Sequence, residues 1–331
     1  MDSPTRNFLG LVSISATLAA YLTCGLVAYV LVPFVGLFPG ALAHLGPVCL
    51  LPAIVLITLV GTSVSLATRT LGRQASASRR LSRWVRALAL PLPAELSLAA
   101  KASRLDGRVS MLDSPERFSF VYGLLVPRVA ISRGLVECLT AEEIRATLDH
   151  ERYHVRHMDP LRALLGKALA EAFFLLPALE ILRFRYEVGR ELAADRCAES
   201  SGGRRPLLGA LLKALEEPGW GPVTGVSLAD PASLDARIVR LETGEAPGLA
   251  PIGIGNLLMS ALGICSLLLL LAEAVIGLGG TSALTGMAAD ELSATGTLGV
   301  LCAVPLIVVV GLAYRYLSRR AGEPLPLADR V

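Results

Sequence analysis

Four long apolar stretches dominate the pattern of hydrophobic and polar positions along the chain. Each is about 20 residues or longer, which is the length that a helix needs to cross the ~30 Å hydrocarbon core of a bilayer. The first two stretches contain no charged side chain, and the last two contain one each. We therefore predict four transmembrane helices. The predicted spans cover residues 8–32, 48–68, 257–279 and 298–317.

The spans pair into an N-terminal hairpin, residues 1–68, and a C-terminal hairpin with a short tail, residues 255–331. The first span is longer than the apolar core of a signal peptide, and a second span follows closely, so we interpret it as a retained anchor. The region between the hairpins, residues 69–254, is more polar. We expect it to form a separate domain.

The middle region contains both the two-residue hydrophobic period of strands and the 3.6-residue period of helices. Runs rich in β-branched and aromatic residues, bounded by Gly and Pro, predict three short strands at 108–112, 118–122 and 128–132. Stretches with helical spacing predict several helices around them. These helices are expected at 87–102 (interrupted by Pro91 and Pro93), from Thr140 to Asp159-Pro160, and at 184–200, 207–215 and 233–243. The pattern predicts an α+β domain inserted into a helical membrane protein.

Composition agrees with a membrane protein. Hydrophobic residues make up 53% of the chain and charged residues only 18%, and the mean hydropathy is +0.59, too apolar for one soluble domain of this length. The net charge is only +3, without a basic tract interleaved with aromatics, so we predict no nucleic-acid binding. The six scattered cysteines form no C-x-x-C pair and are read as small buried hydrophobes.

Charge asymmetry sets the predicted orientation in the bilayer. No acidic residue occurs between Asp2 and Glu95, and a series of arginines follows the second span. Arg319 and Arg320 follow the fourth span, whereas the linker before it is acidic. By the positive-inside rule the termini and the middle region are cytoplasmic. Glu273, inside the third span, is either functional or simply neutral or paired within the helix bundle.

The candidate chemistry lies in the middle region, at His150-Glu151-Arg152-Tyr153-His154. The two histidines of this H-E-x-x-H motif are one helical turn apart and point to the same side, so both imidazoles can bind one zinc ion. Glu151 can act as the general base that takes a proton from a water molecule activated by the metal. Four histidines in 331 residues make a chance occurrence of this arrangement improbable.

A catalytic zinc usually takes a third protein ligand. His157 is about 10 Å further along the same helix than His150, and His44 falls in the predicted outer loop. A carboxylate is left, and Glu191 fits because Asp195 lies one turn beyond it on the same helix face. We expect Glu191 to bind the metal and Asp195 to accept the second N–H of a ligand histidine.

This assignment restricts the apolar run 161–182 that separates the motif from Glu191. A complete transmembrane span there would place the two halves of the site on opposite sides of the bilayer. The run is therefore expected to be an apolar helix that is buried, interfacial or re-entrant, with Lys167, Glu171 and Pro177 as its polar or broken points.

Several of these motifs together resemble the BlaR/MecR-type integral-membrane metallopeptidases. The resemblance extends over about residues 115–242, and it rests on Phe120–Val129, Leu139–Glu143, the H-E-x-x-H motif with Asp159-Pro160, Glu191–Asp195 and Ala236–Leu241. It implies a gluzincin-like zinc metalloendopeptidase domain at the cytoplasmic membrane face. It also implies regulated cleavage of a protein substrate, often a cytosolic winged-helix repressor of the BlaI/MecI type.

The chain departs from the β-lactam sensors of that family. It carries no S-x-x-K, S-D-N and K-T-G set for a penicillin-binding domain after its last span, so direct antibiotic sensing is not expected. A second pair of spans after the catalytic region is the layout of the HtpX and CAAX-prenyl protease group, which is the alternative. A non-catalytic membrane signalling scaffold is a further alternative. For the donor that stabilises the oxyanion, four candidates stay open: Tyr153, His157, Tyr186 and Arg196.

Overall fold

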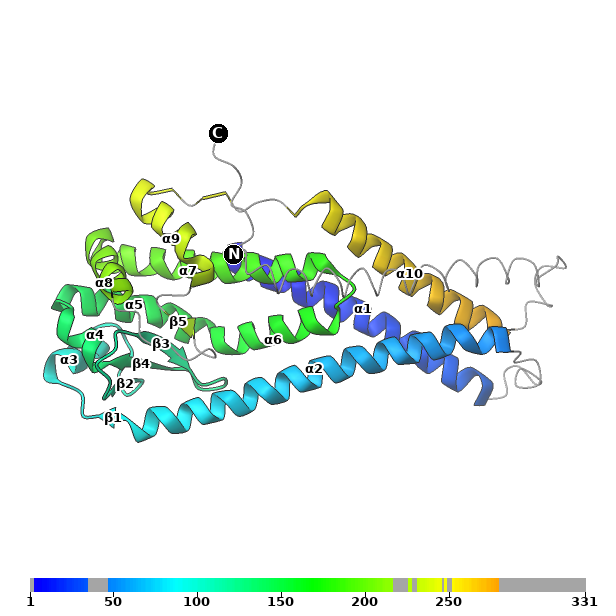
Figure 1. Cartoon of the computed structure of the whole chain (residues 1–331), viewed down its shortest axis with the longest axis horizontal. Coiled ribbons are helices and arrows are strands. Elements are labelled where there is room, and N and C mark those ends of the chain that lie inside the picture. Colours follow the sequence, from blue (N-terminus) through cyan, green and yellow to red (C-terminus); the bar gives the residue numbers. More distant parts are fainter. Residues whose placement is uncertain are drawn as a thin grey trace. The chain divides into compact units, whose positions relative to one another are not determined.

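The computed structural model of the chain describes residues 3–34, 47–216, 226–227, 231–245, 247–248 and 252–279. The chain divides into two compact units. The first unit comprises Met1–Phe8, Arg69–Lys167 and Arg183–Leu249, and the second comprises Leu9–Thr68, Ala168–Leu182 and Ala250–Val331. Most of the described residues are helical, with one small sheet in the first unit (Figure 1).

The sheet of the first unit has five strands in the order β1-β2-β4-β3-β5. Its centre is formed by β2 (Val109–Leu112), β3 (Ser119–Tyr122) and β4 (Arg128–Ser132). β3 and β4 are an antiparallel hairpin, whereas β2 pairs with β4 in parallel. These are the three strands that the sequence predicts, within one residue. The two-residue edge strands β1 (Ala89–Leu90) and β5 (Val226–Ser227) are too short to leave a periodic pattern and were not predicted.

Both faces of the sheet are covered, which explains why every residue of β3 is buried. On one face, Val121, Val129 and Ile131 join the main core with side chains of α3 (Ala94–Ala102), α5 (Ala141–His157) and α8 (Arg204–Glu216). On the other face, Phe120 and Tyr122 pack against Leu81 and Val85 of helix α2 (Pro47–Ala87). The alternation of side chains along each strand therefore supplies two separate apolar layers.

Helix α5 is fixed at both ends. The Thr140 hydroxyl accepts a hydrogen bond from the Glu143 amide (3.3 Å), and the Glu143 carboxylate accepts one from the Thr140 amide (2.8 Å), which is a capping box. Lys213 of α8 also donates to Glu143 (2.6 Å). The helix ends at Met158 in the left-handed conformation (φ 55°), and Asp159 begins the next helix. This geometry determines where the H-E-x-x-H side chains point.

Helix α2 (Pro47–Ala87) contains the predicted span 48–68 and is much longer than that span. It continues through the arginine-rich segment after residue 68, where no proline interrupts it, and gives way to β1 before Pro91. The predicted helix 87–102 is therefore wrong in its first half. Only residues from Ala94 onward are helical, as α3, and α3 follows Pro93 directly.

The apolar run 161–182 is not one helix. It is divided between α6 (Asp159–Ala172) and α7 (Pro177–Gly202), with a turn at residues 173–176 that reverses the chain (Figure 1). Proline at position 177 cannot continue the hydrogen bonding of a preceding helix, but it fits the first turn of a new one. The apolar helix predicted for 161–182 is therefore a helical hairpin, and Pro177, one of its predicted broken points, begins the second helix.

In the second unit, the tip of this hairpin packs among the apolar helices α1 (Ser3–Phe34) and α10 (Ile254–Gly279). Leu176 and Leu179 contact Leu11 of α1, and the Ala178 amide donates to the Ser260 hydroxyl of α10 (3.0 Å). The described helical segments Ile54–Ala87 and Ile254–Leu271 are long and apolar enough to cross a bilayer. The predicted span 298–317 lies outside the described residues.

Gly134 in α4 (Arg133–Cys138) tests the packing of the first unit. A Cβ atom built on this residue would lie 1.9 Å from the carbonyl oxygen of Pro115. That oxygen belongs to the backbone, so no side chain can rotate away to relieve the clash. We expect Gly134→Ala to destabilise the unit by about 1–3 kcal/mol and to lower the thermal unfolding midpoint of the purified protein by several degrees. Gly72→Ala in α2 is the control, since no atom lies within 4 Å of its added Cβ. Equal midpoints for the two variants would contradict this packing.

Candidate metal centre

Three donor atoms meet at one point between α5 and α7. Nε2 of His150 lies 3.2 Å from Nε2 of His154. The carboxylate oxygen Oε2 of Glu191 lies 3.4 Å from the first nitrogen and 3.5 Å from the second. Donors about 2.0–2.1 Å from a tetrahedral zinc ion are about 3.4 Å apart, so this nearly equilateral triangle has the size that zinc requires.

Buried lone pairs show that the triangle fits a cation. All three side chains have no exposed surface, and Oε2 of Glu191 has no hydrogen-bond partner among the described residues. Nδ1 of His154 shares a hydrogen bond with Asp159 (2.7 Å), and Nδ1 of His150 lies 2.9 Å from an Asp195 oxygen. In each imidazole ring the Nδ1 proton then faces an aspartate carboxylate, so the Nε2 atom is directed at the centre of the triangle. Three converging lone pairs repel one another unless a positive charge lies between them.

A second layer of side chains orients each histidine. Asp159, at the start of α6, accepts from His154 and also from the Tyr186 hydroxyl (3.1 Å). Asp195 contacts His150 without the alignment of a full hydrogen bond, and it accepts two bonds from Arg237 of α9 (Pro231–Thr243), at 2.7 and 2.8 Å. Arg237 has no exposed surface. Such carboxylates fix the tautomer and the ring orientation of metal-binding histidines.

Glu151 lies beside the triangle and is equally buried. One of its oxygens accepts a hydrogen bond from the Ser119 hydroxyl of β3 (2.9 Å), and the other has no hydrogen-bond partner among the described residues. Burial raises the pKa of Glu151 above its ordinary value, although the neighbouring histidines and Ser119 oppose this effect. A carboxylate with one free oxygen and a raised pKa is suited to accepting and returning a proton.

Charges around Glu191 have the opposite effect. Burial favours its neutral form, but the positive charges of His154 and Arg190 lower its pKa well below the ordinary value. Arg190 donates two hydrogen bonds to the oxygen that faces away from the histidines (2.8 and 3.0 Å). Burial lowers the pKa of His154, but Glu191 and Asp159 outweigh it and raise that pKa to about 10. Because a ligand histidine must lose this proton, a metal competes with protons here.

The structure brings together all five residues that the sequence singled out: His150, Glu151, His154, Glu191 and Asp195. The contributions of Ser119, Asp159, Arg190 and Arg237 were not predicted. Asp159 had been read as the end of a helix and as part of the family resemblance, and Arg237 only as part of the Ala236–Leu241 resemblance. Nothing in the sequence distinguished Ser119, because its partner lies 32 residues away.

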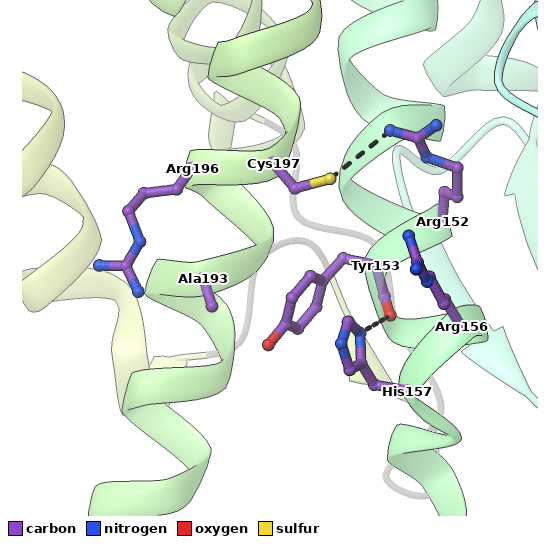
Figure 2. Close-up of a pocket in the computed structure, with 7 residues that line it drawn as sticks. All are labelled: Arg152, Tyr153, Arg156, His157, Ala193, Arg196 and Cys197. Atoms are coloured by element: carbon purple, nitrogen blue, oxygen red, sulfur yellow. Dashed lines mark hydrogen bonds between the residues drawn. The ribbon is translucent and has the colours of Figure 1, made fainter. Parts of the chain in front are cut away.

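The four candidates for the oxyanion donor are separated by the fold. The Tyr186 hydroxyl is engaged by Asp159. Tyr153, His157 and Arg196 line a pocket whose walls do not include the three metal donors (Figure 2). The structure therefore does not select any of the four.

Two comparisons with known proteins bear on this site. Residues 49–241 match the family model of the BlaR1 peptidase M56. A protease HtpX homolog of Aeropyrum pernix is 32% identical over 95 residues, a stretch that covers 26% of this chain and 30% of that relative. The matched region of the family model contains the whole triangle, Glu151 and Arg237, and it covers more than half of the chain. The protein therefore belongs to the BlaR1 peptidase M56 family, a membrane metallopeptidase family, as its motifs indicated.

Proposed function

We propose that this protein is a zinc-dependent endopeptidase of the membrane that cleaves a protein substrate at its cytoplasmic face. The convergence of His150, His154 and Glu191 at separations of 3.2–3.5 Å carries this proposal. In the signalling form of the proposal, the substrate is a BlaI/MecI-like winged-helix repressor, as in the resemblance drawn from the sequence. Cleavage of such a repressor would convert an event at the membrane into a change in transcription.

The residues of the site have distinct roles in this reaction. When bound, zinc would polarise the scissile carbonyl and lower the pKa of a water molecule. The free oxygen of Glu151 accepts a proton from the attacking water and then gives it to the leaving amine, for which its raised pKa is suitable. Glu191 stays ionised as a ligand, and Asp159 and Asp195 keep the two imidazoles in the tautomer that presents Nε2.

Strand β3 is the best-placed element for holding an extended substrate. It packs beside α5 and supplies the Ser119 hydroxyl to Glu151, so its position relative to that carboxylate is fixed. Peptides often bind by adding a strand to a sheet edge. On the side of β3 away from β4, β5 pairs with Phe120 and Val121. A substrate paired to this edge would therefore compete with β5.

The membrane arrangement in this proposal has four spans in two hairpins. The family and the two apolar helices indicate membrane association. The positive-inside pattern places the first unit in the cytoplasm, with Arg69 and the following arginines at its boundary. The helical hairpin α6–α7 is consistent with this arrangement, because a chain that reverses between His154 and Glu191 allows both to lie on one side of the bilayer.

A second candidate is a membrane protease of protein quality control or processing, of the HtpX or CAAX type. The similarity to the HtpX homolog and the predicted second pair of spans favour it. The two candidates share the chemistry and differ in the substrate. A non-catalytic signalling scaffold is less well supported, since the described residues supply three donors and structural zinc sites usually use four.

Glu151→Gln tests the chemistry and the substrate together. The amide keeps the shape of the side chain but cannot accept a proton, so we expect zinc content to stay normal and cleavage to fall by at least ~10³-fold. Glu191→Ala should instead lose zinc. Each variant is assayed in lipid nanodiscs against a winged-helix repressor of the BlaI/MecI type and against an unfolded membrane protein. Full cleavage by Glu151→Gln would disprove the assigned base, and cleavage of only the unfolded protein would favour the second candidate.

Ser119→Ala tests the proton role of Glu151 through pH. The Ser119 hydrogen bond stabilises the charged carboxylate, so its loss should raise the pKa of Glu151 further. The base works when deprotonated. The acidic limb of the kcat/KM profile should therefore move to higher pH, by about 0.5–1 unit for one hydrogen bond. Ser110→Ala on β2, whose hydroxyl contacts Tyr122, is the control and should leave the limb in place. A shift to lower pH would contradict this role.

Arg237→Gln tests the second layer of contacts. Loss of the guanidinium leaves Asp195 buried without its two charge-assisted bonds, so His150 is held less firmly and zinc affinity should fall about 10- to 100-fold. Competition with a chelator measures the affinity. Arg240→Gln on the same helix is the control, because Arg240 pairs with Glu199 instead. Arg237→Lys, which keeps the charge, should recover part of the loss. Equal affinities of Arg237→Gln and Arg240→Gln would exclude a specific role.

A further inference from the structure

A pocket of about 420 Å³ opens between α5 and α7 in the first unit. Figure 2 shows Arg152, Tyr153, Arg156 and His157 on α5, and the facing wall is supplied by α7. The α7 residues are Ala193, Arg196 and Cys197. This pocket has no part in the reaction proposed above.

The pocket and the metal donors use different faces of the same two helices. Arg152 and Arg156 each follow a metal-binding histidine by two residues, which places them about 200° around the axis of α5. On α7, Cys197 follows Asp195 by the same offset. Tyr153 and Ala193, which line the pocket, pack with the buried Ala194 in a small apolar cluster. A ligand in the pocket would therefore be separated from the catalytic centre.

The charged side chains that line the pocket are all basic. Three arginines and a histidine line it, and no acidic side chain does. Arg156 and Arg196 are exposed, and neither has a hydrogen-bond or ion-pair partner among the described residues. Arg152 has weak partners only, with Asp149 at 3.6 Å and the Cys197 thiol also at 3.6 Å. Gathering like charges at one place costs free energy, and a bound anion removes that cost.

The arginines can reach one ligand from both walls. In Figure 2, Arg152 and Arg156 extend from α5 near each other, while Arg196 extends from α7 and points away from them. Arg196 is exposed, and no partner among the described residues holds it, so it can turn towards the pocket at the cost of side-chain entropy alone. Guanidinium groups present paired N–H donors that match the oxygens of a phosphate.

We propose that this pocket binds a phosphate-class oxyanion, supplied either as a soluble phosphate or as the headgroup of an anionic lipid. The anion would be held by Arg152 and Arg156 of α5 and by Arg196 of α7. Because α5 holds both ligand histidines and α7 holds Glu191, an anion bound to both helices links the two elements on which the metal centre is built. Its binding raises the thermal unfolding midpoint of the protein.

The experiment uses the full chain in nanodiscs of zwitterionic phosphatidylcholine, in buffer without phosphate. Inorganic phosphate is the soluble probe, and its binding is followed by equilibrium dialysis and by the unfolding midpoint. Nanodiscs that contain phosphatidylglycerol are the second arm. The test variant is Arg156→Ala combined with Arg196→Ala. The control is Arg145→Ala, which removes the same charge from α5 at a residue that does not line the pocket.

Saturable phosphate binding that the double variant weakens at least tenfold, and that Arg145→Ala keeps, supports the proposal with a soluble ligand. A midpoint that rises only with phosphatidylglycerol, and only when Arg156 and Arg196 are present, supports it with a lipid headgroup. Equal effects of the control and the double variant would overturn it, since the binding would then reflect general charge. Absence of both responses in the wild-type protein would overturn it too.

Discussion

The structure depends on one buried convergence of two imidazole nitrogens and a carboxylate oxygen, whose lone pairs repel one another unless a proton, as on His154, or a metal ion lies between them. His150, His154 and Glu191 have no exposed surface, so water does not relieve the repulsion between them. A fold can maintain such an arrangement only if a cation is gained there, or if the surrounding contacts are strong enough to hold the donors in place. The structure supplies those contacts from α6, α7, α8 and α9.

The donors are held in place by contacts at both ends of α5 and by buried ion pairs. The capping box and Lys213 fix the start of α5, and the left-handed residue Met158 turns the chain so that Asp159 meets His154. On the other side, Arg237 brings α9 against α7 through Asp195. Removing one partner of a buried pair leaves a charge without compensation, which costs far more than a surface pair is worth. The metal centre and the packing of these helices are therefore one structure.

The candidate metal ligands could be predicted because they lie close together in the sequence. The residues that support them could not, because their partners are distant in the sequence. H-E-x-x-H and the pair Glu191–Asp195 each lie within two turns of one helix, where sequence offsets give direction in space. Ser119 and Arg237 reach their partners across 32 and 42 residues, and no periodicity encodes such pairing. The apolar run 161–182 was placed correctly as a segment that separates the ligands. Its division into two helices follows from the turn before Pro177, which hydrophobicity alone does not locate.

The distribution of partners among the buried acids explains how one site holds both ligands and a base. Burial alone would raise the pKa of every carboxyl group in it. Glu191 has Arg190 and His154 beside it, and Asp195 has Arg237, so the pKa of each is lowered and both stay ionised. Glu151 has only a neutral hydroxyl as its hydrogen-bond partner, and its pKa is raised. Carboxyl groups a few ångströms apart thus differ in whether an arginine reaches them. In the proposed reaction, that difference keeps the candidate ligand Glu191 and its neighbour Asp195 charged, and leaves Glu151 as the group that exchanges a proton.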